Sequence, residues 1–389
     1  MSTAVKSGRQ ASKADVPTLR RSGDFEYTFP AIRGVQAGRE YYVTMCPLRL
    51  IPRLFVFKDA EMAPELRAQR NLNKARVPEI AQYVVNNLDS YVFSALTASV
   101  DADLRFEPYG DQGRDRRVGT LAIPMSARFI INDGQHRQAA IERALEEKPE
   151  LGDESIAIVF FLDLGLARCQ QMFADLNRHA IRPAKSLGVL YDHRDVMSAI
   201  TRLMVTRLPM LRELTETERT GVSARSRKLF TLSSFYTANR ALLEGTDELS
   251  AERRVDVAAE YWDAVSQQFP EWGMVYDGVL TSGAVRREFI HSHSIVLHAL
   301  GKVGNSLLGP GFDPKGGGWT RKLRRLSSLD WRRGADSACT WEGRATTGGV
   351  VCKSSVHVLL TTAAIRTALG LPLLETEARA EESLRGGNA

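Results

Sequence analysis

The chain has 389 residues, 43% of them hydrophobic and 25% charged, which is typical of a globular protein long enough for two domains. No apolar stretch approaches the length of a membrane span, and the polar, basic residues 1–21 lack the apolar core of a secretory signal, so we expect a cytoplasmic protein that has no membrane partner. The formal net charge of +6 favours a polyanionic partner.

The four cysteines lie far apart in the sequence, at Cys46, Cys169, Cys339 and Cys352. None belongs to a Cys-x-x-Cys motif, which argues against a zinc ribbon, a redox pair and a disulfide framework. Arg168 is the one sequence neighbour that favours the thiolate of Cys169, so a redox role of Cys169 is left open.

Residues 1–24 are predicted to be a disordered basic tail, and residues 25–163 carry the patterns of one domain. The patterns follow this order: strands at 27–29, 40–45 and 51–57, a helix within 58–90, then strands at 91–100, 105–109, 118–123 and 129–131, a helix from 140, and a strand at 155–162. The polar cluster at 110–117 predicts a hairpin tip. This order of elements predicts an α+β fold rather than an alternating doubly wound one.

The stretch 127–141 joins an apolar run to the sequence Asp-Gly-Gln-His-Arg and then to a helical pattern. Asp133-Gly134 is a turn signal, so the sequence predicts a strand, a tight turn and a helix. Because a helix start carries unpaired N–H groups and partial positive charge, this turn with the basic residues His136 and Arg137 could bind an anion such as phosphate.

Asp133 complicates anion binding at the turn, because its carboxylate would compete for the same donors. We therefore expect Asp133 to be the N-cap of the helix, or a ribose or metal ligand. The candidate phosphate- or nucleotide-binding residues of the turn are Asp133, Gly134, Gln135, His136 and Arg137. The alternative is a capped Asp-Gly turn followed by a solvated arginine.

Two basic loops could contribute further ligands to the turn. Arg70 and Arg76 lie in a cationic loop before a helix, where they could reach a second phosphate. The second loop follows a predicted helix at 167–176 and carries Asn177, Arg178, Arg182 and Lys185. These side chains could face the same ligand, or they could solvate a junction between domains, and solvation is also the alternative for the first loop.

Residues 164–375 are predicted to form a second, mainly helical domain that binds DNA. Helical patterns lie at 194–206, 209–218, 232–244, 250–269, 285–302 and 353–369. His291, His293 and His298 share one of these predicted helices but do not lie on one face, so we predict no metal site there. Residues 376–389 are expected to be a frayed tail.

Basic residues cluster at two places in the helical half. A loop carries Arg225, Arg227 and Lys228. The segment 319–333 carries six cations and one acid, the cations being Arg321, Lys322, Arg324, Arg325, Arg332 and Arg333. Leucines at helical spacing and two flanking tryptophans predict a helix that docks through its apolar side and presents a basic face. Double-stranded DNA is the natural partner for such a face, whereas a solvated amphipathic helix is the alternative.

The pentapeptide Asp-Gly-Gln-His-Arg resembles the signature of the DGQHR-domain family, and the chain resembles, within it, the DndB family of DNA sulfur modification. The segments 69–84, 173–186 and 287–293 are also similar to that family. More distantly, the family resembles the N-terminal domain of ParB-type partition proteins and sulfiredoxin, in which a Gly-acid-Arg-Arg turn at a helix start binds nucleotide phosphates.

The resemblance implies an N-terminal mixed-sheet, ParB/sulfiredoxin-like domain over residues 25–163. Gly134 and Arg137 match its phosphate-binding turn, and Arg70 and Arg76 match the arginine-bearing box that precedes the turn. The pair Gln-His stands here in place of the Glu-Arg of the partition proteins.

The resemblance also implies a bacterial regulator of the DNA phosphorothioation genes that binds promoter DNA and carries out no sulfur transfer itself.

The alternative is an enzyme, a nucleotide hydrolase or DNA-nicking protein, that uses the same turn with a nucleoside triphosphate and Mg²⁺, and with Asp133 and His136 as its reactive pair. No second carboxylate with clear metal-ligand spacing accompanies this pair, which favours the regulator. A third hypothesis makes the turn a phosphate-controlled switch without turnover. The sequence leaves open the operator and the oligomeric state, for which a homodimer is one alternative.

Overall fold

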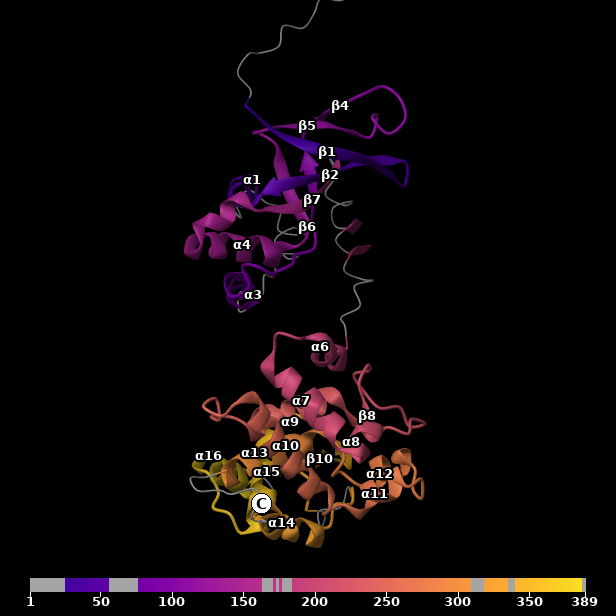
Figure 1. Cartoon of the computed structure of the whole chain (residues 1–389), viewed down its shortest axis with the longest axis vertical. Helices are drawn as coiled ribbons and strands as arrows, with labels where there is room; N and C mark the ends of the chain where they lie inside the picture. The colour runs from indigo at the N-terminus through magenta and orange to yellow at the C-terminus, as the bar shows by residue number, and fades with distance from the viewer. Residues whose placement is uncertain are drawn as a thin grey trace, which may run out of the picture. The chain divides into compact units, whose positions relative to one another are not determined.

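The computed structural model describes residues 25–55, 76–162, 171–172, 175–176, 184–308, 318–334 and 340–386. The chain divides into two compact units, Met1–Ile181 and Arg182–Ala389. The first holds a mixed seven-stranded sheet and the second is mainly helical, which confirms the predicted α+β class (Figure 1). Each unit has its own cluster of buried apolar side chains.

The sheet has the strand order β4, β5, β1, β2, β7, β3, β6, and every neighbouring pair is antiparallel except β7 and β3. Its strands are β1 (Glu26–Gln36), β2 (Arg39–Pro47), β3 (Leu96–Asp101), β4 (Arg105–Pro108), β5 (Val118–Pro124), β6 (Arg128–Asp133) and β7 (Ser155–Leu162). The apolar run of β7 fits its place between two other strands, whereas β6 lies at an edge of the sheet.

Three helices of the first unit, α1 (Ile51–Leu54), α3 (Arg76–Val85) and α4 (Gln135–Glu147), lie to one side of the sheet (Figure 1). Short 3₁₀ helices, η1 (Leu48–Leu50) and η3 (Pro149–Asp153), precede α1 and follow α4. The predicted strand at 51–57 is wrong over its described part, because Pro52 starts a helical turn and Leu48, Ile51 and Leu54 are buried at a spacing of three.

The second unit consists of helices and two pairs of very short strands. The helices are α6 (Lys185–Tyr191), α7 (Val196–Arg207), α8 (Pro209–Leu214), α9 (Leu232–Leu242), α10 (Ala251–Ser266), α11 (Pro270–Tyr276), α12 (Ser282–Glu288), α13 (Ser294–Leu307), α14 (Gly318–Leu323), η5 (Arg324–Ser328), α15 (Ser355–Leu369) and α16 (Glu375–Gly386). The strand pairs are β8 (Thr215–Glu216) with β9 (Phe230–Thr231), and β10 (Thr346–Thr347) with β11 (Val350–Val351).

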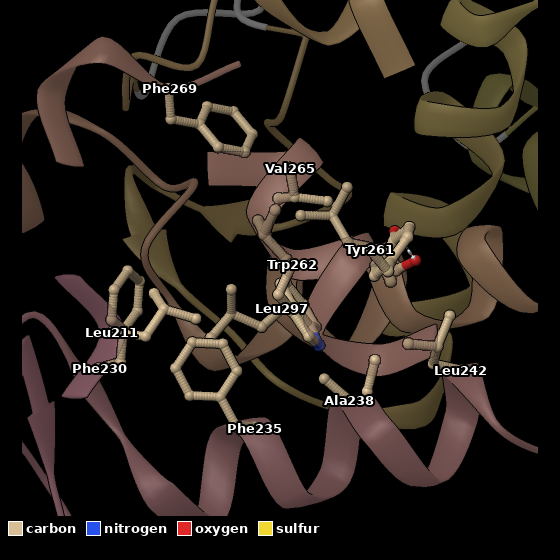
Figure 2. Close-up of a cluster of buried hydrophobic side chains, with 14 of the residues drawn as sticks. Leu211, Phe230, Phe235, Ala238, Leu242, Tyr261, Trp262, Val265, Phe269 and Leu297 are labelled. Carbon is tan, nitrogen blue, oxygen red and sulfur yellow. Dashed lines mark hydrogen bonds between the residues drawn. The ribbon is translucent and has the colours of Figure 1, made fainter. Parts of the chain in front are cut away.

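Aromatic side chains fill the core of the second unit. Trp262 of α10 packs edge-on against Phe235 of α9, with ring centroids 5.1 Å apart, and Leu297 of α13 lies beside them (Figure 2). The indole Nε1 of Trp262 donates a hydrogen bond of 2.7 Å to Oδ1 of Asn239, which leaves this buried polar group satisfied. Among the described helices, none is both long and apolar enough to cross a bilayer.

Two helix predictions for the second unit are wrong in their bounds. The helix expected at 285–302 is two helices, because residues 289–293 leave the helical path and Ile290 N donates to the carbonyl of Trp331. The helix expected at 209–218 ends at Leu214, after which Thr215 pairs with Phe230.

The tail expected to fray from residue 376 is instead part of α16 as far as Gly386. Two of its carboxylates are buried in ion pairs: Glu377 with Arg366 at 3.2 Å, and Glu381 with Arg344 at 2.7 Å. The frayed tail was expected from its place at the chain end, but these two acids hold the segment on the unit.

Candidate functional site

The DGQHR turn connects the edge strand β6 to α4, as the sequence predicted. Gly134 has φ +100°, a conformation that side chains strongly disfavour. A Cβ at this position would lie 2.5 Å from Cδ2 of Leu96 and 2.9 Å from Nη2 of Arg137. Both the backbone and the space around it therefore require glycine here.

Asp133 is not the N-cap of α4. Gly134 occupies that position without any side-chain hydrogen bond to the helix start. The Oδ2 atom of Asp133 instead accepts a hydrogen bond of 2.7 Å from Nη2 of Arg137, one helical turn later. The predicted capping role is therefore wrong, because the arginine has taken up the carboxylate. The role of Asp133 as a ribose or metal ligand remains a prediction.

Arg137 is the most constrained cation of the turn. Its side chain is 19% exposed, whereas that of Asp133 is 48% exposed. Besides Asp133 it donates to Oγ of Ser94, and its Nε is buried without a hydrogen-bond partner among the described residues. Ser94 was missed by sequence reasoning, since it precedes a strand distant in sequence and carries no pattern that would mark it.

The strand pairing beside the turn is irregular. Thr97 pairs with Asp133 but Ala98 pairs with Ile131, so the register of β3 and β6 shifts at Asn132. Asn132 is buried, and its Nδ2 donates to Oγ of Ser99 at 2.8 Å. Such bulges often turn side chains toward a site at a sheet edge, and this one lies directly before the turn.

His136 and Arg76 lie near each other although they are sixty residues apart. Burial and the positive charge of Arg76 both lower the pKa of His136, which keeps its imidazole neutral at pH 7. Arg76 begins α3, and α3 packs against α4. Arg76 thus lies near enough to His136 to act on its charge, and its role as a phosphate ligand remains a prediction. Gln135 turns back to donate to the carbonyl of Ile131.

The structure does not test the other predicted partners of the turn. Arg70, Asn177, Arg178 and Arg182 lie outside the described residues, as does Cys169. Lys185 begins α6 of the second unit. Their role as ligands of a phosphate at the turn remains a prediction.

The basic segment 319–333 is anchored by its apolar residues. Trp319, Leu323, Leu326 and Trp331 are buried. The segment is not one helix, since α14 passes into the 3₁₀ helix η5 and the chain then becomes extended. Five of its six predicted DNA-contacting cations have exposed side chains, namely Arg321, Lys322, Arg324, Arg325 and Arg332.

Arg333 differs from the other cations of this segment. Its Nη2 donates to the carbonyl of Gly349 at 2.8 Å and its Nη1 to that of Arg286 at 3.2 Å. These bonds turn the guanidinium toward the protein, so Arg333 serves the fold of this region.

The basic loop before β9 is only partly exposed. The side chains of Arg225 and Arg227 face solvent, and Arg227 lies 3.9 Å from a carboxylate oxygen of Glu213. Lys228 Nζ donates to the main-chain carbonyl of Glu213 at 2.6 Å, which ties this lysine to the end of α8. Arg225 is therefore the loop cation most accessible to a ligand.

His291 and His293 of the second unit have partners inside the protein. His291 accepts a hydrogen bond of 2.9 Å from Nε1 of Trp272, and Nε2 of His293 lies 2.9 Å from the carbonyl oxygen of Arg286. Burial lowers the pKa of His291 despite the nearby carboxylate of Glu271, and it lowers that of His293 to about 4. Both are therefore neutral at pH 7.

A family model described as DndB, DNA-sulfur modification-associated, matches residues 29–372 and so spans both units. No curated protein and no solved structure matches the chain.

Proposed function

Because the chain belongs to the DndB family of DNA-sulfur modification-associated proteins, we propose that it is a DNA-binding transcriptional regulator of a bacterial DNA phosphorothioation gene cluster. Membership of this family indicates involvement in DNA sulfur modification. The regulatory role, the promoter as the target and the phosphate-binding role of the DGQHR turn belong to the proposal.

The observation that carries the proposal is the exposed basic segment of the second unit. Arg321, Lys322, Arg324 and Arg325 are exposed between the buried anchors Trp319, Leu323 and Leu326. The anchors fix the backbone that carries these side chains, and the cations could each contact a backbone phosphate of DNA. Such contacts position a protein on DNA but carry no sequence information, so promoter selection would need other groups.

A binding titration tests the proposal. The full chain is titrated with promoter DNA of the modification genes and with random DNA of equal length, at two salt concentrations. We expect affinity to fall steeply with salt for both DNAs and to be higher for the promoter. Equal affinity for the two DNAs would exclude a promoter-specific regulator.

The alternative function is a nucleotide hydrolase or DNA-nicking enzyme that acts through the turn with a nucleoside triphosphate and Mg²⁺. The half-exposed carboxylate of Asp133 and the neutral imidazole of His136 support it, since one could bind a metal ion and the other accept a proton. Hydrolysis by the native protein that is lost in Asp133→Ala and in Arg137→Ala would favour the enzyme. Absence of turnover together with intact DNA binding would favour the regulator.

A further inference from the structure

A groove of about 330 Å³ lies between α9 and α13 of the second unit. It is lined by Thr237, Arg240, Ala241, Glu244, His298 and Lys302. The two helices approach closely below it, because Gly301 faces the main-chain carbonyl of Ala238, where a Cβ would lie only 2.2 Å from the oxygen. The polar side chains that line the groove therefore lie above a floor formed by the closely packed backbones of α9 and α13.

His298 and Glu244 lie at opposite ends of the groove. Gly301 lies opposite Ala238, and Nδ2 of Asn305 donates to the carbonyls of Leu242 and Glu244, so α9 and α13 run in the same direction. His298 therefore lies toward the N-terminal end of the groove, and Glu244 lies at the opposite end. Lys302 is one turn beyond His298 on the same face of α13.

Two further lysines add positive charge at the His298 end. Lys353, which precedes α15, lowers the pKa of His298 together with Lys302, and burial is the largest cause of a shift that brings this pKa to about 4. Lys185, at the start of α6, lowers the pKa of Lys353 in turn. Elements distant in sequence thus bring Lys302 and Lys353 near His298, and Lys185 near Lys353.

This basic cluster lacks neutralising partners within the described part of the chain. No carboxylate there forms an ion pair with Lys185, Lys302 or Lys353. The Nδ1 atom of His298 is buried without a hydrogen-bond partner from those residues. Like charges held together in this way oppose folding, and an anion bound among them would relieve the repulsion.

We propose that this groove is an anion site that binds a phosphate group, with Arg240, Lys302 and His298 as its ligands. A phosphate has several acceptor oxygens, which suits a guanidinium, an ammonium and an imidazole converging from two helices. Lys185 and Lys353 raise the local positive potential without contacting the ligand. The phosphate belongs to a DNA strand or to a free nucleotide, two sources that share this chemistry.

The groove shares no lining residue with the DGQHR turn or with the basic segment 319–333. The test therefore uses inorganic pyrophosphate, because its binding can be measured whether or not the protein binds DNA or regulates genes. Calorimetric titration of the full chain should show a pyrophosphate site whose affinity falls about tenfold in Arg240→Gln and in Lys302→Gln. Arg212→Gln, an exposed cation of α8 outside the groove, is the matched control and should leave affinity unchanged.

A spectroscopic readout distinguishes ligand binding from a change in folding. Histidine signals in the NMR spectrum should show the pKa of His298 rising by about one unit or more when pyrophosphate is added, because an adjacent anion favours the imidazolium. The NMR signal that disappears in His298→Gln is the signal of His298. The proposal is overturned if pyrophosphate does not bind, if binding is lost in Arg137→Gln but kept in the groove variants, or if the signal of His298 does not move.

Competition identifies the source of the phosphate. A short DNA duplex that displaces pyrophosphate, and that binds Lys302→Gln more weakly than the native chain, would show that the groove holds the DNA backbone. Displacement by ATP but not by the duplex would show a nucleotide site. Either result supports the phosphate site.

Discussion

Nη2 of Arg137 lies 2.7 Å from Oδ2 of Asp133, so the principal cation of the DGQHR turn is already paired. A phosphate at this turn would have to share the guanidinium with the carboxylate or displace it. Repulsion between the carboxylate and the incoming anion would weaken binding. Asp133 thus sets how strongly the turn can hold an anion, which gives a direct test of the phosphate-binding hypothesis.

We expect Asp133→Asn to strengthen binding of ATP at the turn, measured without added metal, by about fivefold, since it removes one negative charge within hydrogen-bond distance of Arg137. Asp101→Asn, an exposed aspartate at the end of β3, is the control and should change little. Weaker binding in Asp133→Asn would show that the carboxylate is itself a ligand, as a ribose or metal role requires.

The conformation of the turn can be tested at Gly134. Gly134→Ala should destabilise the first unit by about 3 kcal/mol, because it combines a left-handed backbone with overlap against Leu96. Gly38→Ala is the matched control, since Gly38 has φ +73° but a Cβ added there would have no atom within 4 Å, and it should cost about 1 kcal/mol. Urea unfolding measures both, and equal losses would show that the space around Gly134 is less restricted than its contacts imply.

The strand, turn and helix around Gly134 were predictable because each residue there acts locally: an apolar run, an Asp-Gly turn and a periodic helix. The pairing of Asp133 with Arg137 was not, since a turn aspartate suits a cap equally well. The positions of Ser94 and Asn132 beside the turn depend on how β3 pairs with β6, and no local sequence pattern specifies that pairing. The groove between α9 and α13 was missed for the same reason, because Lys353 and Lys302 come near His298 only in the folded unit.

Charge reversal tests the proposed DNA face. The double change Arg324→Glu and Arg325→Glu should weaken DNA binding at least tenfold and reduce the slope of log affinity against log salt by about two, one for each lost phosphate contact. The change Arg379→Glu with Arg385→Glu alters net charge equally on α16 and is the control. If both pairs reduce affinity alike, the effect reflects total charge and the assignment of the face is wrong.

The buried ion pair between Arg366 and Glu377 should hold α16 in place. The two side chains are 6% and 3% exposed, so Glu377→Ala would leave a buried guanidinium without its counter-charge and should cost about 3 kcal/mol or more. Glu375→Ala removes an exposed partner of Arg379 and should cost less than about 1 kcal/mol. Urea unfolding and protease sensitivity of the C-terminus measure the difference, and equal effects would contradict a specific tether.

The neutral, buried state of His293 should make the second unit acid-sensitive. The unfolded chain protonates this histidine below about pH 6.5, whereas burial and Arg286 lower the pKa in the folded unit to about 4. Between these values the unfolded state binds the extra proton, so the free energy of unfolding falls as the pH falls, by about 1.4 kcal/mol per pH unit for a fully shifted histidine.

His293→Gln should flatten this dependence, and His193→Gln, in the exposed loop before α7, should not. Unfolding curves at several pH values measure the slopes. Because the hydrogen bond to the carbonyl of Arg286 can be replaced by the amide of glutamine, an unchanged slope in His293→Gln would show that other groups cause the acid sensitivity.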